Sequence, residues 1–289
     1  MFRGSLEAWY SRITVDDLQA LAGDSFDLSA RVKKKVAEAH KQTHEHVFQK
    51  VTTPSRGLPR ILDQPPLIYH VDPEQIGESA IADAFRQYRD SLADERRMLL
   101  DRFKMVDMAL KVVGVGSVGT RCFVMLLLAA PDDALFLQVK EAGPSVLERY
   151  TGAQKVEHNG KRVVVGQRLM QSASDIFLGW ARGPQRDFYF RQLRDMKVSV
   201  DVETQPPKLM KAYAMLCGLA LARAHDKAGD AAMIAGYLGG SDQFDEAIGD
   251  YAMAYADQVE RDYATFTRAI RRGRLKSDLS PSQLETALR

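Results

Sequence analysis

The stretch Gly114-Val115-Gly116-Ser117-Val118-Gly119 follows an apolar segment at residues 109–113 and fits the pattern G-x-G-x-x-G. Glycine has no Cβ and accepts a positive φ angle, so the backbone N–H groups of such a turn can approach phosphate oxygens closely. Two architectures use this pattern with opposite structural consequences, and it also arises by chance in tight turns that bind nothing. The conformation of the chain after the turn therefore decides the fold.

The first of these architectures is a Rossmann unit. Its third glycine opens a helix, and an acidic residue about 20 positions further on binds the ribose of a dinucleotide. Here residues 120–130 would form the helix, and Glu141 would be the acidic residue. This interpretation predicts a dinucleotide-binding oxidoreductase.

The second architecture is a kinase-type hairpin. The turn joins two antiparallel strands above the phosphates, and a third strand carries a lysine that binds them. Residues 121–128 would be the second strand, and Phe136-Leu137-Gln138-Val139-Lys140 would be the third. The second-strand segment is apolar on every side, and Pro131-Asp132-Asp133 suits a tight turn. These details favour the hairpin, while the Rossmann unit stays open as the alternative.

The remaining segments alternate between strand-like and helical patterns. Apolar runs typical of strands occupy residues 67–71, 109–115, 121–128, 135–139, 176–181 and 188–193. Helical patterns occupy residues 1–50, 76–103, 163–174, 209–225 and 244–270. The proline-rich segment 52–66 predicts a loop with at most a short strand.

Two of the helical segments also predict what is buried. Residues 209–225 are apolar on most faces, which predicts a buried helix. Residues 244–270 carry tyrosines at helical spacing, and we interpret this stripe as core rather than as a ligand site.

These patterns predict an α+β protein. We expect a small antiparallel sheet with a glycine-rich hairpin, like the nucleotide lobe of a kinase, flanked by mostly helical segments. The expected regions are a mainly helical N-terminal segment at 1–105, a β-rich nucleotide-lobe-like region at 106–200, and a helical C-terminal region at 201–289.

Composition narrows the possible partners. The 289 residues are 45% apolar, enough for the core of one large or two modest domains. Forty basic and 38 acidic residues give a net charge of +2, which argues against dedicated binding to nucleic acid or to a membrane surface. The two cysteines, Cys122 and Cys217, lie in apolar runs and predict buried thiols. With no visible signal peptide and no bilayer-length apolar stretch, we expect a cytoplasmic protein.

Several segments of the chain resemble the bacterial family called domain of unknown function 2252. They are residues 111–121, 136–142, 144–148, 166–171, 175–180, 190–197 and 221–225. The likeness is close from about residue 99 to residue 264 and looser before that. The family is grouped with protein-kinase-like and aminoglycoside-phosphotransferase-like folds, and its biochemical role is not established.

The resemblance implies ATP with magnesium as the ligand, and it implies roles for particular residues. The backbone of Gly114, Gly116, Ser117 and Gly119 would cover the phosphates, and Lys140 would pair with their oxygens. A carboxylate should hold Lys140 in place, and Glu148 is the preferred candidate ahead of Glu141 and Asp175. Gln192 and Arg194 belong to the segment 192–197, which would be the hinge facing adenine.

The chain departs from the family at one important point. Relatives carry a Gly-Asp-x-His-x-x-Asn segment and an Asp-rich segment that resemble a catalytic loop and a metal-binding aspartate. Neither occurs here, and the nearest similar segment, at residues 225–230, lacks the asparagine. The resemblance therefore implies a nucleotide-binding part with little or no phosphotransfer of its own, whose missing half is either absent or supplied by a partner chain.

A non-catalytic kinase-like binding module is a further alternative. No metal-binding residues are predicted, because His40, His44 and His46 have no obvious third ligand nearby.

Overall fold

In the computed structural model of this chain, the described residues are 52–55, 58–71, 77–114, 119–131, 133–152, 156–171, 173–193, 202–203 and 205–276. The helical interpretation of residues 1–50 lies outside them. The chain divides into two compact units, Met1–Gly229 and Asp230–Arg289. None of the helices within these ranges has the length and hydrophobicity needed to cross a lipid bilayer.

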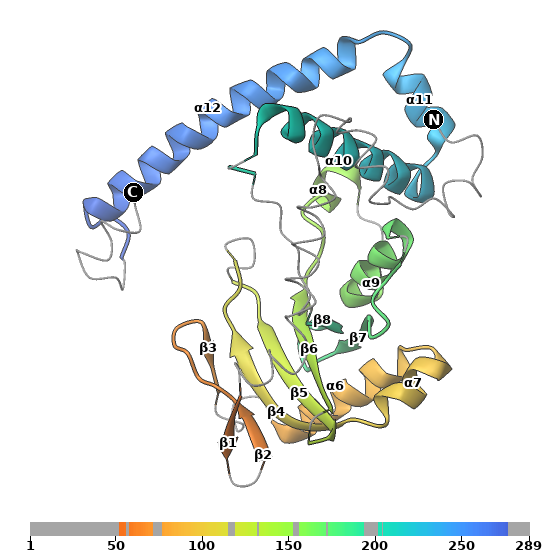
Figure 1. The fold of residues 1–289 in the computed structure, drawn as a ribbon, viewed down its shortest axis with the longest axis vertical. Coiled ribbons are helices and arrows are strands. Elements are labelled where there is room, and N and C mark those ends of the chain that lie inside the picture. The colour runs from red at the N-terminus through yellow and green to blue at the C-terminus, as the bar shows by residue number, and fades with distance from the viewer. Residues whose placement is uncertain are drawn as a thin grey trace. The chain divides into compact units, whose positions relative to one another are not determined.

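Unit 1 is built around an antiparallel sheet (Figure 1). Within the described residues its strand order is β3-β4-β5-β6-β8-β7, and every neighbouring pair is antiparallel. The strands are β3 Ile68–Tyr69, β4 Lys104–Lys111, β5 Cys122–Ala130, β6 Asp133–Ala142, β7 Gly179–Arg182 and β8 Asp187–Gln192. The expected α+β class is confirmed.

The segment after the glycine-rich turn is a strand. β5 pairs with β4 on one side and with β6 on the other, with Phe123 opposite Leu110 and Cys122 opposite Lys140. A Rossmann unit requires a helix at this place, so the Rossmann interpretation of the turn is wrong and the antiparallel hairpin is confirmed. The side chains of residues 122–127 are all buried, because β5 is a central strand covered on both faces.

A second, two-stranded sheet lies in the proline-rich segment. β1 Thr52–Ser55 pairs antiparallel with β2 Leu58–Ile61. The expectation of a loop with at most one short strand is therefore wrong. Prolines are tolerated because this small sheet consists only of edge strands. Ile61 is buried against Ala109, Val124 and Phe136 of the large sheet.

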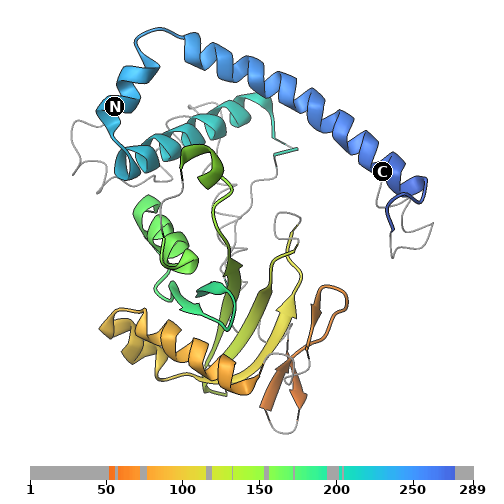
Figure 2. The same cartoon turned by 180° about the vertical axis from the view of Figure 1, so that it is seen from behind.

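Helices cover both faces of the large sheet at its β7 end. α6 Glu78–Asp90 and α7 Asp94–Leu100 lie on one face, where Tyr88 stacks on Phe190 with ring centroids 4.1 Å apart. α9 Asn159–Met170 lies on the other, where Lys161 is 5.8 Å from the ring centroid of Trp180. Figure 2 shows the β7–β8 hairpin between α6 and α9.

The core of the sheet follows from strand alternation. Leu135, Leu137 and Val139 of β6 join Tyr88, Leu100 and Phe190 in the cluster under α6 and α7. Phe136, between them in sequence, joins the opposite cluster. Successive side chains of a strand point to opposite faces, so the single apolar run at residues 135–139 contributes to two cores.

α10 Pro207–Ala228 forms at the predicted place, but it is not buried on most faces. Ala212, Arg223 and Ala224 are buried, whereas Met215, Leu219 and Leu221 are exposed. Leucine, methionine and alanine are strong helix formers wherever they lie, so the apolar composition predicted the helix correctly and its burial wrongly.

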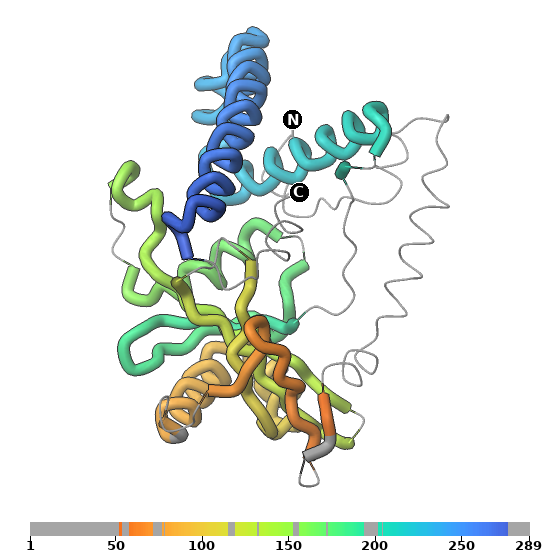
Figure 3. The backbone as a smooth tube through the Cα atoms, turned by 90° about the vertical axis from the view of Figure 1, so that its left-hand side faces the viewer, coloured from red at the N-terminus to blue at the C-terminus, as the bar shows by residue number. Residues whose placement is uncertain are grey.

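Unit 2 contains two helices in its described part, α11 Ala231–Leu238 and α12 Gln243–Arg271. α12 runs as one continuous helix (Figure 3). Its tyrosine stripe is not core: Tyr251, Tyr255 and Tyr263 are 62%, 55% and 51% exposed. Helical spacing therefore identified an apolar face here without showing what covers it.

Candidate functional site

The glycine-rich turn leaves the sheet between β4 and β5. Gly114 follows β4 by three residues, and Gly119 precedes β5 by three. Gly119 has a φ of 84°, in the left-handed region that a residue with a Cβ enters only under strain. Residues 115–118, including the predicted phosphate contacts Gly116 and Ser117, lie outside the described residues. The two outer glycines thus place both ends of the turn at one end of the hairpin.

Lys140 lies at the same end of the sheet as the turn. It is the register partner of Cys122, the first residue of β5, so the two side chains are neighbours on one face. On its other side Lys140 is opposite Tyr189 of β8. Lys140 therefore lies near the end of β6, next to the described ends of the turn, Gly114 and Gly119.

Two further cations share this face with Lys140. Lys111 ends β4 on the same side as Ala109, and Arg191 of β8 is opposite Gln138 of β6. Burial raises the pKa of the Cys122 thiol, while the positive charges of Lys140, Lys111 and Arg191 act in the opposite direction. All three cations therefore lie within electrostatic range of one buried sulfur. We call Lys111, Lys140 and Arg191 the cationic face.

A short chain of hydrogen bonds holds the middle of the cationic face. Arg191 donates from Nε to Oε1 of Gln138 over 2.9 Å. Gln138 donates from Nε2 to Sγ of Cys122 over 3.4 Å. Gln138 is only 5% exposed, so its amide is a fixed support and orients the Arg191 guanidinium. Sequence reasoning named Lys140 as a candidate but did not name Lys111 or Arg191, because only the strand register brings these residues together.

No acidic residue among those described forms an ion pair with this face. Among the residues that the structure describes, neither Lys111 nor Lys140 forms an ion pair, and Arg191 binds only the neutral Gln138. Partly buried cations without counter-ions form a ready site for an anionic ligand.

The carboxylates expected to hold Lys140 are used elsewhere. Glu148 accepts the backbone N–H of Ser145 over 2.8 Å at the start of α8 Glu148–Thr151. Glu141 accepts the backbone N–H of Arg121 and pairs with the side chain of Arg186. In place of the expected ion pair with Lys140, Glu148 therefore makes a local cap.

The third candidate, Asp175, bridges two backbone segments. Its Oδ1 accepts the N–H of Phe177 over 2.8 Å, and its Oδ2 accepts the N–H of Gln192 over 2.5 Å. This fixes Gln192 at the end of β8, where the expected hinge begins. Arg194, the other hinge residue, lies outside the described part of the chain.

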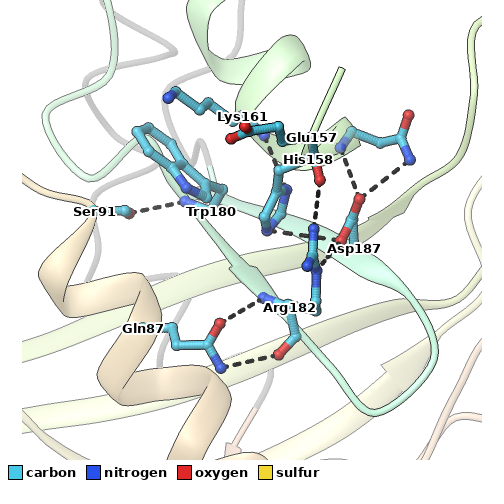
Figure 4. Close-up of polar contacts among 9 residues, drawn as sticks. Gln87, Ser91, Glu157, His158, Lys161, Trp180, Arg182 and Asp187 are labelled. Carbon is cyan, nitrogen blue, oxygen red and sulfur yellow. Dashed lines mark hydrogen bonds and ion pairs between the residues drawn. The ribbon is translucent and has the colours of Figure 1, made fainter. Parts of the chain in front are cut away.

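A polar cluster attaches α9 to the β7–β8 hairpin (Figure 4). Asp187 Oδ2 accepts the backbone N–H of Asn159 over 2.7 Å and its side-chain amide over 3.1 Å, and Oδ1 accepts Nε of Arg182 over 3.0 Å. Burial opposes ionisation of Asp187, but these hydrogen bonds and the nearby positive charges together lower its pKa. The carboxylate therefore holds the first turn of α9 in place.

His158 caps the N-terminus of α9, and its imidazole ring is neutral when it does so. Its Nδ1 accepts the N–H of Lys161 over 3.3 Å, which requires an unprotonated nitrogen. Asp187 Oδ1 lies 3.8 Å from Nε2, too far for a good hydrogen bond. Burial lowers the pKa of His158 and outweighs the attraction of Asp187 for the charged form. This cluster orients α9 beside the lysine strand, yet α9 itself has no acidic residue to offer Lys140.

Comparison with known proteins gives one family. A family model described as an uncharacterised protein conserved in bacteria (DUF2252) matches residues 2–269. The matched range therefore extends beyond residues 99–264, where the resemblance read from the sequence is close. No match was found among curated proteins or among solved structures. Because the model covers most of its length, the chain belongs to the DUF2252 family.

Proposed function

We propose that unit 1 binds ATP with magnesium, the phosphates lying between the glycine-rich turn and the cationic face. The observation that carries this proposal is the register of Cys122 with Lys140, which places a strand amine at the end of the hairpin that the turn closes. Lys111 and Arg191 add two more cations on the same face. Three cations and a turn rich in backbone donors suit a triphosphate, which carries several negative charges.

The chain order around Lys140 supports a kinase-type arrangement. Protein kinases cover the phosphates with a glycine-rich loop, carry the lysine on the third strand, and place a helix next to it. Here the order is β4, the turn, β5, β6 with Lys140, the four-residue α8, and then α9, followed by the β7–β8 hairpin. The support is a likeness of layout, and the functional argument still depends on the residues themselves.

We further propose that this chain alone binds the nucleotide with little or no phosphotransfer. Active kinases require an ion pair between the strand lysine and a glutamate of the neighbouring helix. α9 contains no glutamate, and Lys140 has no carboxylate partner among the described residues. The magnesium ion would accompany the phosphates of the bound nucleotide. These observations favour a binding module over a complete enzyme.

Binding can be tested with the full chain by titrating a fluorescent ATP analogue in the presence of magnesium. A charge-assisted hydrogen bond contributes about 1.5–3 kcal/mol, so Lys140→Ala should weaken binding by about 10- to 150-fold. Lys104→Ala is the matched control, because Lys104 is exposed and begins β4 at the end of the strand away from the glycine-rich turn. We expect Lys104→Ala to bind like the unmodified chain.

Two results would count against the proposal. Absence of binding at millimolar ATP, with the chain folded, would remove the nucleotide site. Equal weakening by Lys140→Ala and Lys104→Ala would show only nonspecific attraction to positive charge. Separately, ATP hydrolysis that Lys140→Ala abolishes would overturn the claim that this chain binds without chemistry.

A further inference from the structure

A cavity of about 410 Å³ lies on the sheet face opposite to the cationic face. Phe123, Met125 and Val139 line it from the sheet. These residues alternate along β5 and β6 with Cys122, Gln138 and Lys140, so the cavity and the cationic face are separated by the thickness of one sheet. The volume falls within the usual range for small-molecule sites, roughly 300–1,000 Å³.

Two small side chains of α6 help to keep the cavity open, although Ile81 of the same helix also lines it. Ala80 and Ala84, four residues apart on α6, lie on one helix face and line the cavity. Larger residues at these positions would fill the space between helix and sheet. Phe188 and the turn between β7 and β8 form another wall. Most of the lining is therefore apolar, and suits an apolar ligand body.

The cavity also has a cation whose guanidinium is unpaired within the described residues. Arg121 and Arg186 both line it. Glu141 pairs with the side chain of Arg186 and accepts the backbone N–H of Arg121, so its two oxygens are engaged. Within the described residues, the guanidinium of Arg121 forms no hydrogen bond or ion pair. One guanidinium is thus available beside an apolar floor.

We propose that this cavity binds an amphipathic monocarboxylate, a molecule with an apolar body and one carboxylate group. The apolar body would pack on Phe123, Met125 and Val139, and the carboxylate would pair with the planar guanidinium of Arg121. A group with more negative charge is disfavoured, because Glu141 lies beside the same position. The site is independent of the nucleotide proposal, since none of the cationic-face residues lines it.

Isothermal titration calorimetry of the full chain tests this, with octanoate as the probe and 1-octanol as its uncharged match. We expect octanoate to bind and octanol to bind at least about tenfold more weakly, because it cannot form the charge-assisted pair. Ala84→Phe should abolish octanoate binding by filling the cavity. Arg121→Gln should reduce octanoate affinity to that of octanol, whereas Arg102→Gln, which changes an exposed arginine outside the cavity, should leave it unchanged.

Three results would overturn the proposal: no octanoate binding at millimolar concentration, equal affinities for octanoate and octanol, or unchanged binding by a folded Ala84→Phe variant. If circular dichroism shows that Ala84→Phe is unfolded, the Arg121→Gln comparison decides by itself, because Arg121 is exposed and its guanidinium bonds to no other described residue. Lys140→Ala should keep octanoate binding, so failure of the nucleotide proposal and failure of this one are separable.

Discussion

Gly160 in the first turn of α9 gives the sharpest test of how this helix is attached to the sheet. A Cβ at this position would lie 2.2 Å from the carbonyl oxygen of Phe188 and 2.8 Å from its carbonyl carbon. Both atoms belong to the backbone of β8 and cannot rotate away. We therefore expect Gly160→Ala to push α9 off the sheet and to destabilise the protein.

The size of the effect follows from two opposing contributions. The Cβ–oxygen distance is roughly 1 Å shorter than ordinary contact, and overpacking of this kind typically costs about 1–3 kcal/mol. Alanine gains at most about 1 kcal/mol over glycine in a helix interior, and less in the first turn. The net free energy of unfolding should fall by about 1–2 kcal/mol, which lowers Tm by about 2–4 °C for each kcal/mol in a unit of this size.

Gly166→Ala is the matched control, since Gly166 lies in the middle of the same helix and a Cβ there would have no neighbour within 4 Å. It should stabilise the protein by about 0.5–1 kcal/mol through helix propensity. Urea denaturation followed by far-UV circular dichroism measures both variants. If Gly160→Ala is as stable as Gly166→Ala, α9 does not approach β8 as closely as the structure shows, and the reasoning fails.

Three further predictions concern buried polar groups. Tyr88→Phe should destabilise the protein by about 1–3 kcal/mol in urea denaturation, because the fully buried hydroxyl donates to the carbonyl of Phe177 over 2.8 Å. Burial lowers the pKa of His158, so its contribution to stability is complete above about pH 6.5 and is lost as the pH falls through the lower folded-state pKa. His158→Asn, which keeps a capping side chain, should therefore lose less stability between pH 7 and pH 5 than the unmodified chain does; an equal loss would contradict a neutral buried ring. The expected burial of both cysteines is right for Cys122 and wrong for Cys217, which is exposed. A thiol reagent should therefore modify only Cys217 in the folded protein and both cysteines in urea, because Cys122 is 1% exposed and burial raises its pKa.

The sheet could be predicted from the sequence because its central strands carry a strong pattern. Residues 122–127 are uniformly apolar, and such a run fits a strand covered on both faces better than an amphipathic helix. The turn-forming residues Pro131-Asp132-Asp133 then predicted that the next strand runs antiparallel to this one. The β1–β2 hairpin was missed because its prolines argue against strands unless the strands are known to lie at an edge.

The candidate site was less predictable, because it depends on register and on competition between partners. Lys111 and Arg191 join Lys140 only through pairing of strands far apart in sequence. Glu148 was expected to pair with Lys140. Its carboxylate instead binds a backbone N–H three residues away, because a local partner requires less loss of conformational entropy. Likewise, the periodicity of α12 identified its apolar face but could not say whether another element covers it.

Within the described residues Lys140 has no carboxylate partner, and this bears directly on what the proposed site could do. A lysine held by a glutamate has part of its charge neutralised and its position fixed, so its interactions can be matched to a transition state. In the described part of this chain, the cationic face carries three cations without such a partner. In the proposed nucleotide complex they would attract the ground-state phosphates as strongly as any transition state, and uniform attraction of this kind improves binding without accelerating a chemical step. The charge arrangement is therefore consistent with the proposed binding of phosphates without chemistry, and phosphotransfer would need carboxylates contributed from beyond the described residues.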